Sequence, residues 1–403
     1  MSGAISESLS ETLFNHLLEK TPDPTLLQTK LMSELDLSES DGREVLYQVV
    51  KQVNRQFFPP ITQLEIIHTE GCNLGCTYCF ERNMLGYKKM PADVAYASVD
   101  LLFDYSFDEH DLTLTHFGGE PTLNFPGIQL VTEYAEKKAA AHGKTITFNM
   151  TTNGILINET MANYFAQHRI MVLLSIDGLE STHDRYRVDK GGHGTFKRVL
   201  RALNILKRSQ SWIGIKMTVM PENVDYLFND VRGLYDLGVN HFIIGHATGI
   251  PWSSEAMACY ERRLGELFSW YRSNPHDDLR IDGFDEDADD GFFGCQAART
   301  SVAVAISGEI SPCSKIMGLN SKELIGKLGD IRYGIFCISN RTALVGCSQL
   351  KSACEEEGIA ESYQGGCFAV NQAENGDMFR PSLQEHRISM LKRSACAGCS
   401  GCH

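Results

Sequence analysis

Three cysteines, Cys72, Cys76 and Cys79, stand in the stretch GCNLGCTYCF with the spacing C-x3-C-x2-C. A structural zinc site needs four protein ligands, and a cubane [4Fe–4S] cluster has four irons to ligate. Three thiolates on one loop would therefore leave one iron of a cluster without a protein ligand. Because an open coordination position is where a metal centre carries out chemistry, this loop predicts a reactive iron–sulfur site. A zinc site completed by His68 is the alternative.

Short apolar runs alternate with amphipathic stretches on both sides of this loop. The expected strands cover residues 64–70, 112–117, 145–151, 170–176, 213–219 and 241–246. Strands that alternate with helices indicate βαβ units and parallel pairing. The pattern predicts an α/β fold, a partial (β/α)6 TIM-type barrel, with an open doubly wound sheet as the competing arrangement.

Further candidate residues directly follow the second, third and fourth strands. They lie in the sequences FGGEP (117–121), TTNG (151–154) and SIDG (175–178). Loops after the strands of a barrel meet at its catalytic end, so these residues should converge with the cysteines. Paired glycines let the backbone approach a ligand closely, and a carboxylate such as Glu120 can accept from an ammonium group. HDRYR brings Arg185 and Arg187 to the same rim, where one of them could pair with a carboxylate.

Three regions are expected along the chain. Residues 1–61 form a helical N-terminal segment, residues 62–285 the barrel, and residues 286–403 a small Cys-rich domain after the acidic linker DGFDEDADDG. Nine of the 13 cysteines fall between Cys295 and Cys402. The net charge of −14 argues against nucleic acid or an anionic membrane as partner. We find no signal peptide and no spanning apolar run, and clustered thiols without disulfides are typical of a cytoplasmic location.

Together, the cysteine loop and the strand-end motifs resemble the radical SAM superfamily over residues 62–250, with Tyr78 as the aromatic residue before the last cysteine. The resemblance implies that Cys72, Cys76 and Cys79 hold a [4Fe–4S] cluster and that S-adenosylmethionine (SAM) chelates its open iron. It also implies reductive cleavage of SAM to a 5′-deoxyadenosyl radical, with electrons from a flavodoxin or ferredoxin type of reductant. The residues expected to contact SAM are Tyr78, Gly118, Gly119, Glu120, Asn153, Ser175, Asp177 and, in preference to Arg185, Arg187.

The C-terminal region resembles the SPASM domain of radical SAM maturases, which carries one or two auxiliary [4Fe–4S] clusters. The later SPASM signature, C-x2-C-x5-C-x3-C, ends at Cys367 and begins at Cys354, but its inner positions fall on Glu357 and Tyr363. The expected first cluster uses Cys295, Cys313, Cys367 and Cys347, with Cys337 as the rival fourth ligand. The expected second cluster uses Cys354, Cys396, Cys399 and Cys402, whereas His403 and the isolated Cys259 are left out.

Four functions fit this resemblance. The leading one is maturation of a ribosomally synthesised precursor peptide through a thioether or carbon–carbon crosslink, with an auxiliary cluster accepting an electron. The second is anaerobic sulfatase maturation, although Ser314 replaces the Asp that typically follows the cluster cysteine in that family. The third is dehydrogenation of a small alcohol, and the fourth is electron transfer without catalysis. The N-terminal segment has helices but no strand pattern of a winged-helix leader-binding module.

Overall fold

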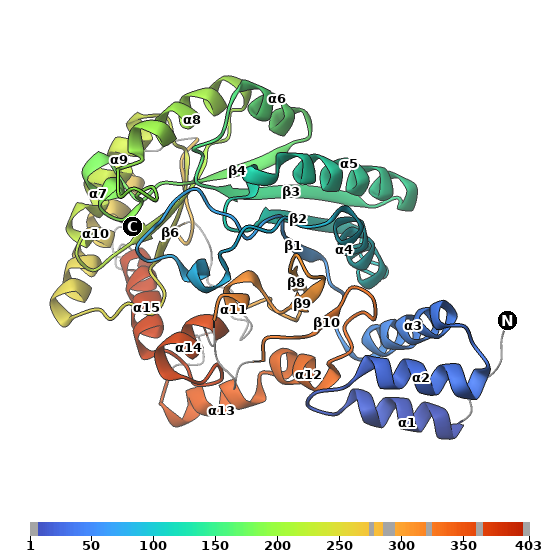
Figure 1. Cartoon of the computed structure of the whole chain (residues 1–403). Coiled ribbons are helices and arrows are strands. Elements are labelled where there is room, and N and C mark those ends of the chain that lie inside the picture. The colour runs from blue at the N-terminus through green and yellow to red at the C-terminus, as the bar shows by residue number, and fades with distance from the viewer. Residues whose placement is uncertain (1–6, 274–277, 285–294, 320–324, 360–365, 398–403) are drawn as a thin grey trace.

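Parallel strands alternate with helices from residue 63 onward in the computed structural model, which describes residues 7–273, 278–284, 295–319, 325–359 and 366–397 (Figure 1). The first six strands are β1 (Gln63–Ile67), β2 (Asp111–Phe117), β3 (Thr145–Thr152), β4 (Ile170–Ser175), β5 (Gly214–Val219) and β6 (His241–His246). The later strands are β7 (Arg280–Ile281), β8 (Ser301–Val304), β9 (Glu309–Ser311) and β10 (Gly329–Asp330). All six predicted strands are therefore present, and β1 ends three residues earlier than expected.

Helices occupy the connections between the parallel strands and both ends of the described chain. The N-terminal helices are α1 (Glu7–Leu17), α2 (Pro24–Leu35) and α3 (Glu39–Phe57). The barrel carries α4 (Ala92–Tyr105), α5 (Phe125–His142), α6 (Glu159–Gln167), α7 (Glu180–Tyr186), α8 (Phe196–Ser209), α9 (Leu227–Asp236) and α10 (Ser254–Ser273), with 3-10 turns η1 (Phe80–Met84), η2 (Pro121–Asn124) and η3 (Val224–Tyr226). The C-terminal helices are α11 (Ser314–Met317), α12 (Ile338–Gly346), α13 (Ser348–Glu356), α14 (Phe368–Asn375) and α15 (Leu383–Ala397).

The sheet runs in the order β10-β9-β8-β1-β2-β3-β4-β5-β6-β7. Strands β1 to β6 are neighbours in chain order and pair in parallel, as in a barrel wound in one direction. A doubly wound sheet would instead reverse its strand order at a switch point, so the predicted partial barrel is confirmed. Strand β8 pairs in parallel with β1, and the sheet thus continues past the predicted boundary at residue 285.

Alternation along the strands separates the packed face from the interior of the barrel. Leu112 and Leu114 of β2, and Ile215 and Met217 of β5, are buried in the main hydrophobic core. Their neighbours at the alternate positions are mostly polar and point the other way. The barrel interior is therefore not filled with aliphatic side chains, as it is in a complete TIM barrel, and space for ligands remains.

The N-terminal helices pack against the C-terminal region and, through α3, against α4 of the barrel. Leu13, Leu31 and Leu46 share a second core with Phe336 and Ile338, and Figure 1 shows α1 to α3 beside α12. Tyr47 and Lys51 of α3 both bond Asp104 of α4, at 2.9 Å. Among the described residues up to Phe57, the regular elements are all helices.

A buried arginine of α12 fixes this junction. Arg341 donates to Asn54 Oδ1 of α3 at 2.6 Å, to the Pro59 carbonyl at 2.7 Å and to the Ala298 carbonyl at 3.0 Å. Hydrogen bonds from a charged donor are stronger than neutral ones. They hold α3 and the start of β1 against the C-terminal region.

Candidate active site

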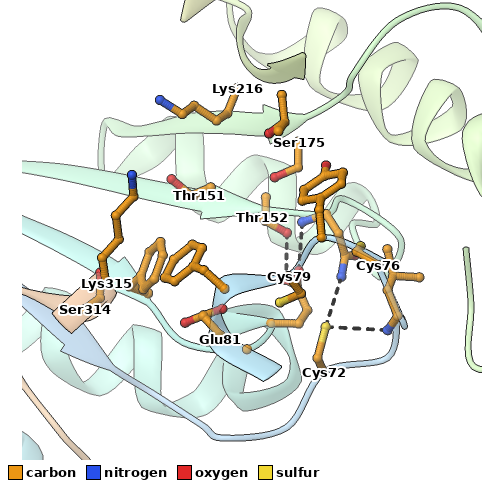
Figure 2. A pocket seen from close by; sticks show the side chains of 18 of the residues that line it. Cys72, Cys76, Cys79, Glu81, Thr151, Thr152, Ser175, Lys216, Ser314 and Lys315 are labelled. Atoms are coloured by element: carbon orange, nitrogen blue, oxygen red, sulfur yellow. Dashed lines mark hydrogen bonds between the residues drawn. The ribbon is translucent and has the colours of Figure 1, made fainter. Parts of the chain in front are cut away.

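A cavity of about 440 Å³ lies inside the barrel and opens at the carboxyl ends of its strands. Figure 2 shows side chains from the cysteine loop, from the strands β3, β4 and β5 and from the C-terminal region converging on it. Its lining includes Cys72, Cys76, Tyr78, Cys79, Gly118, Gly119, Glu120, Asn153, Ser175, Arg187 and Cys313. Of the eight residues expected to contact SAM, only Asp177 is missing from this lining.

The cysteine loop is held by the backbone of the FGGEP loop. Glu120 N donates to the Gly71 carbonyl at 2.8 Å, and Gly119 N donates to the Thr69 carbonyl at 3.1 Å. A Cβ on Gly119 would lie 2.5 Å from the Gly71 carbonyl oxygen, and one on Gly118 would lie 2.6 Å from the Thr69 carbonyl oxygen. The two glycines therefore allow two protein loops to touch, in addition to any approach to a ligand.

Glu120 is a fully buried carboxylate that connects the ends of two strands, β2 and β3. Its Oε1 accepts from Thr122 N at 3.1 Å and from the Thr152 hydroxyl at 2.6 Å, and its Oε2 accepts from Asn153 N at 2.8 Å. Burial raises the pKa of Glu120, while these hydrogen bonds oppose the rise because they favour the charged form. Glu120 lines the cavity, and its Oε2 accepts a single bond from the described residues, so this oxygen has capacity for a further donor.

Asp177 does not line the cavity but accepts hydrogen bonds from two residues that do, Tyr78 and Arg187. Its Oδ2 accepts from Arg187 Nε at 2.9 Å and from the Tyr78 hydroxyl, and its Oδ1 accepts from Thr218 N at 2.9 Å. The Arg187 guanidinium lies 5.4 Å from the centre of the Tyr78 ring. The structure thus gives Asp177 a role in fixing Arg187 and Tyr78, and its contact with SAM stays a prediction. Arg185 instead lies over the ring of Tyr186, at 5.5 Å.

His183 positions Asp177 and Arg187 in turn. Asp177 N donates to His183 Nδ1 at 3.4 Å, and Thr195 Oγ1, 3.0 Å from His183 Nε2, donates to the Arg187 carbonyl at 2.7 Å. His183 Nε2 must therefore carry the ring proton, and the imidazole is neutral. Burial, with the Arg187 charge adding to it, lowers the pKa of His183 to about 3.

The three thiols of the cysteine loop need a positive partner. Burial raises the pKa of Cys72 to about 12 and also raises the pKa values of Cys76 and Cys79. A buried thiolate is stable only when a cation compensates it, as a metal centre does. His68, the alternative fourth ligand, is not among the residues that line the cavity. Its Nε2 lies 2.8 Å from His116 Nδ1 behind the loop.

Electrostatic interactions link four cysteines of the C-terminal region. Burial is the main cause that raises the pKa of Cys295, to about 11, and the charges of Cys367 and Cys347 add to it. Cys367 and Cys295 likewise add to the effect of burial on Cys313. Among the described residues, no three His, Cys, Asp or Glu side chains are grouped closely enough to hold a metal ion, so the first auxiliary cluster stays a prediction.

Cys337 lies elsewhere. It is buried in the second core with the N-terminal helices, and the charges that act on it are those of Lys327 and Glu309. The geometry therefore favours Cys347 over Cys337. For the expected second cluster, Cys354 is buried in the main core, but the side chain of Cys396 and the whole of Cys399, Cys402 and His403 lie outside the described residues.

Four charged cavity residues were not predicted from the sequence: Glu65, Glu81, Lys216 and Lys315. Glu65 Oε2 accepts from Ser314 N at 2.9 Å, which joins β1 to α11. Burial, with Glu65 and Glu120 nearby, raises the pKa of Glu81 to about 8. For Glu65 and Lys216, the sequence signal was a charged residue within a strand pattern, in LEII and IKMTV. In a barrel such a side chain is expected to point into the interior.

Comparison with known proteins agrees with this geometry. Residues 66–232 match the Radical SAM superfamily. The match falls within the barrel, which is therefore similar to the radical SAM superfamily.

Individual relatives extend the comparison. The chain is 31% identical over 163 residues to a cysteine-type anaerobic sulfatase-maturating enzyme of Clostridium novyi (strain NT). This alignment covers 38% of the present chain and 42% of the relative. The fold of the present chain is similar to that of native anSMEcpe with bound AdoMet and Cp18Cys peptide, with a TM-score of 0.65, 20% identity and coverage of 84% of this chain and 97% of the other. It is also similar to Streptococcus suis SuiB bound to precursor peptide SuiA, with a TM-score of 0.60, 16% identity and coverage of 86% and 80%. None of the helices that the structure describes is long and apolar enough to cross a membrane.

Replacing Gly119 with Ala should push the cysteine loop away from the FGGEP loop, since the new Cβ would meet the Gly71 carbonyl. We expect a loss of about 1–3 kcal/mol in the free energy of unfolding and a lower iron content after anaerobic reconstitution. Gly265→Ala in α10 is the matched control, because nothing lies within 4 Å of the added Cβ. It should be neutral or stabilising by up to about 1 kcal/mol. Equal behaviour of the two variants would contradict the proposed contact.

The neutral His183 predicts a specific loss of stability in acid. The unfolded chain takes up a proton near pH 6.5, whereas the folded chain resists it until about pH 3, so this contribution is lost as the pH falls through that window. Relative to His183→Gln, which cannot titrate, the wild type should lose about 1.4 kcal/mol per pH unit below 6.5. Urea unfolding at pH 7, 6 and 5, with equal iron content in both proteins, measures this difference. Parallel pH dependences would show that His183 is not held neutral.

Proposed function

We propose that Cys72, Cys76 and Cys79 hold a [4Fe–4S] cluster and that SAM binds to it in the cavity. Three partly buried thiols on one loop, with Glu120 lining the same cavity, fit this group. When bound, the cluster and SAM supply one-electron cleavage of SAM and a 5′-deoxyadenosyl radical. Glu120 Oε2 accepts from the SAM amino group, and Arg187, fixed by Asp177, pairs with its carboxylate. Asn153 and Ser175 offer partners for the ribose hydroxyls.

We further propose that the substrate is a peptide or protein and that the reaction forms a thioether or carbon–carbon crosslink. The observation that carries this proposal is that Cys313 lines the same cavity as Cys72, Cys76 and Cys79. An auxiliary cluster held by Cys313, Cys295, Cys347 and Cys367 would lie beside the reacting carbon, where it could accept the electron that bond formation releases. A flavodoxin or ferredoxin type of protein would supply the first electron. The similarity to two peptide-bound folds supports a peptide substrate.

Formylglycine formation in a sulfatase is the second candidate. It is favoured by the identity with the Clostridium novyi relative and by the Glu65 carboxylate, which bonds the backbone of Ser314 next to Cys313. That carboxylate lies close to the position where sulfatase maturases typically carry an Asp. Mass analysis after incubation with sulfatase peptides that contain Cys or Ser separates this function from crosslinking.

The first test of the proposed function is SAM cleavage. Anaerobically reconstituted, reduced protein should convert SAM to 5′-deoxyadenosine, and Cys76→Ala should abolish the product because the cluster loses one of three ligands. Cys259→Ala, a partly buried cysteine on α10, is the control and should retain activity. Liquid chromatography with mass detection measures the product. Failure of the wild-type protein to form it would refute the proposal.

Iron content distinguishes the two candidate fourth ligands of the first auxiliary cluster. Cys347→Ala should lose up to about four irons per chain, whereas Cys337→Ala should keep the wild-type content, which is about twelve if two auxiliary clusters are present. Both cysteines are buried, so the pair is matched for packing cost. Iron and sulfide analysis after reconstitution gives the answer. Loss of iron in Cys337→Ala alone would reverse the assignment.

A further inference from the structure

Lys216 projects from the middle of β5 into the barrel interior. It pairs in register with Ser175 of β4, and both line the cavity. On its other side, β6 contributes Gly245 and His246 to the lining, and a Cβ on Gly245 would lie 3.8 Å from Lys216 Nζ. At Gly245 the strand therefore places no side chain over the amine.

A second amine comes from the C-terminal region. Lys315, in the first turn of α11, lines the same cavity, and it is the main charge that lowers the pKa of Lys216 after burial itself. Together these effects, with a further contribution from Lys392, bring the pKa of Lys216 to about 8. In the view of Figure 2, Lys216 and Lys315 lie across the cavity from Cys72 and Cys76. Within the described ranges, neither amine forms an ion pair or a hydrogen bond.

Two carboxylates near these lysines each lie beside a histidine, and the charges of Lys315 and Lys392 help to lower the pKa of one of them, Glu385. Glu385 Oε2 lies 2.7 Å from His246 Nε2, and Asp282 Oδ1 lies 2.6 Å from His241 Nε2. Lys392 Nζ donates to the Ile244 carbonyl at 2.7 Å. A largely buried cation without a partner is costly, and an anion that enters the cavity would remove that cost.

Acidic and basic side chains are mixed in the lining of the cavity. Glu65, Glu81 and Glu120 line it together with the two lysines, and Glu65 Oε2 accepts from Ser314 N, next to Lys315. Arg187, whose charge acts on Cys76, is the cation next to the cysteines. Arg187 is therefore the proposed partner of the SAM carboxylate, and Lys216 and Lys315 remain available to bind another anion.

We propose that Lys216 and Lys315 bind a carboxylate of the substrate, either an acidic side chain or a C-terminal carboxylate, and so place the reacting residue beside the cluster. This inference rests on the proposed function, because it takes the cavity to be the place where a peptide reacts. Two ammonium groups can each donate to one carboxylate oxygen, and such charge-assisted bonds are strong in a site shielded from water. An acidic residue near the modified position would then be a requirement of the substrate.

Three small probes test the site on the reconstituted protein with SAM bound. N-acetyl-glutamate N-methylamide carries only a side-chain carboxylate, N-acetyl-alanine only a terminal one, and N-acetyl-glutamine N-methylamide neither. Saturation-transfer NMR titrations should show binding of one or both acids and at least about tenfold weaker binding of the amide. Whichever acid binds identifies the source of the carboxylate. Equal binding of all three probes, or binding of none, overturns the proposal.

Variants assign the binding to the lysines. Lys216→Gln should lower the affinity for the acid probe by about tenfold or more, and Lys216→Arg, which keeps the charge, should retain most of the wild-type affinity. Lys197→Gln removes a lysine whose side chain is 82% exposed on α8 and should bind as the wild type does. Wild-type affinity in Lys216→Gln would overturn the proposal, and so would a tenfold loss of SAM affinity in that variant, since the lysine would then serve SAM.

The readout separates this inference from the proposed function. Probe binding requires no SAM cleavage, and SAM cleavage by the wild-type protein requires no probe. Probe binding without 5′-deoxyadenosine formation would refute the proposed function alone. Formation of 5′-deoxyadenosine without probe binding would refute the carboxylate site alone.

Discussion

The buried carboxylate of Glu120 is the interaction on which the rest of the site depends. It accepts hydrogen bonds from the ends of β2 and β3, and its own backbone N–H holds Gly71, directly before Cys72. Because the carboxylate is fully buried, losing any of these donors would leave charge without compensation. One residue thus fixes the cysteine loop relative to two strand ends. Glu120 also lines the cavity where SAM is proposed to bind, and its Oε2 can accept a further hydrogen bond.

The fold was largely predictable because its signals are local. Period-two apolar runs such as LTLTHF and IMVLLS specify buried strands, and the helices between them carry their own apolar faces. Strand order then follows from parallel pairing of sequential βα units. The strand β8 could not be predicted, because SVAV is short and lies among cysteines and glycines. Only its pairing with β1, more than 200 residues away in the sequence, makes it part of the sheet.

The site was predictable to the level of loops but not to the level of each side chain. SIDG marked the end of a strand correctly. Asp177, however, is bonded to Arg187 and Thr218 N, and His183 accepts from its backbone N–H. These partners lie elsewhere in the sequence, so the motif alone does not predict them. Cys337 and Cys347 were equivalent by spacing. In the structure only Cys337 of the two packs in the second core with the N-terminal helices, and this long-range contact cannot be predicted from cysteine spacing. Lys216 was not predicted as a site residue, because the strand pattern does not show that this position of β5 lines the cavity inside the barrel.

These observations describe a barrel whose interior stays polar and open so that cysteines, a buried glutamate and two lysines can meet around one cavity. The central claim is that the cluster held by Cys72, Cys76 and Cys79 keeps one iron for SAM. Electron paramagnetic resonance of the reduced, anaerobically reconstituted protein, recorded before and after SAM is added, tests it most directly. The account predicts that SAM shifts the signal of one cluster, because its ligand field changes when the open iron is filled. A spectrum that is identical with and without SAM would contradict it.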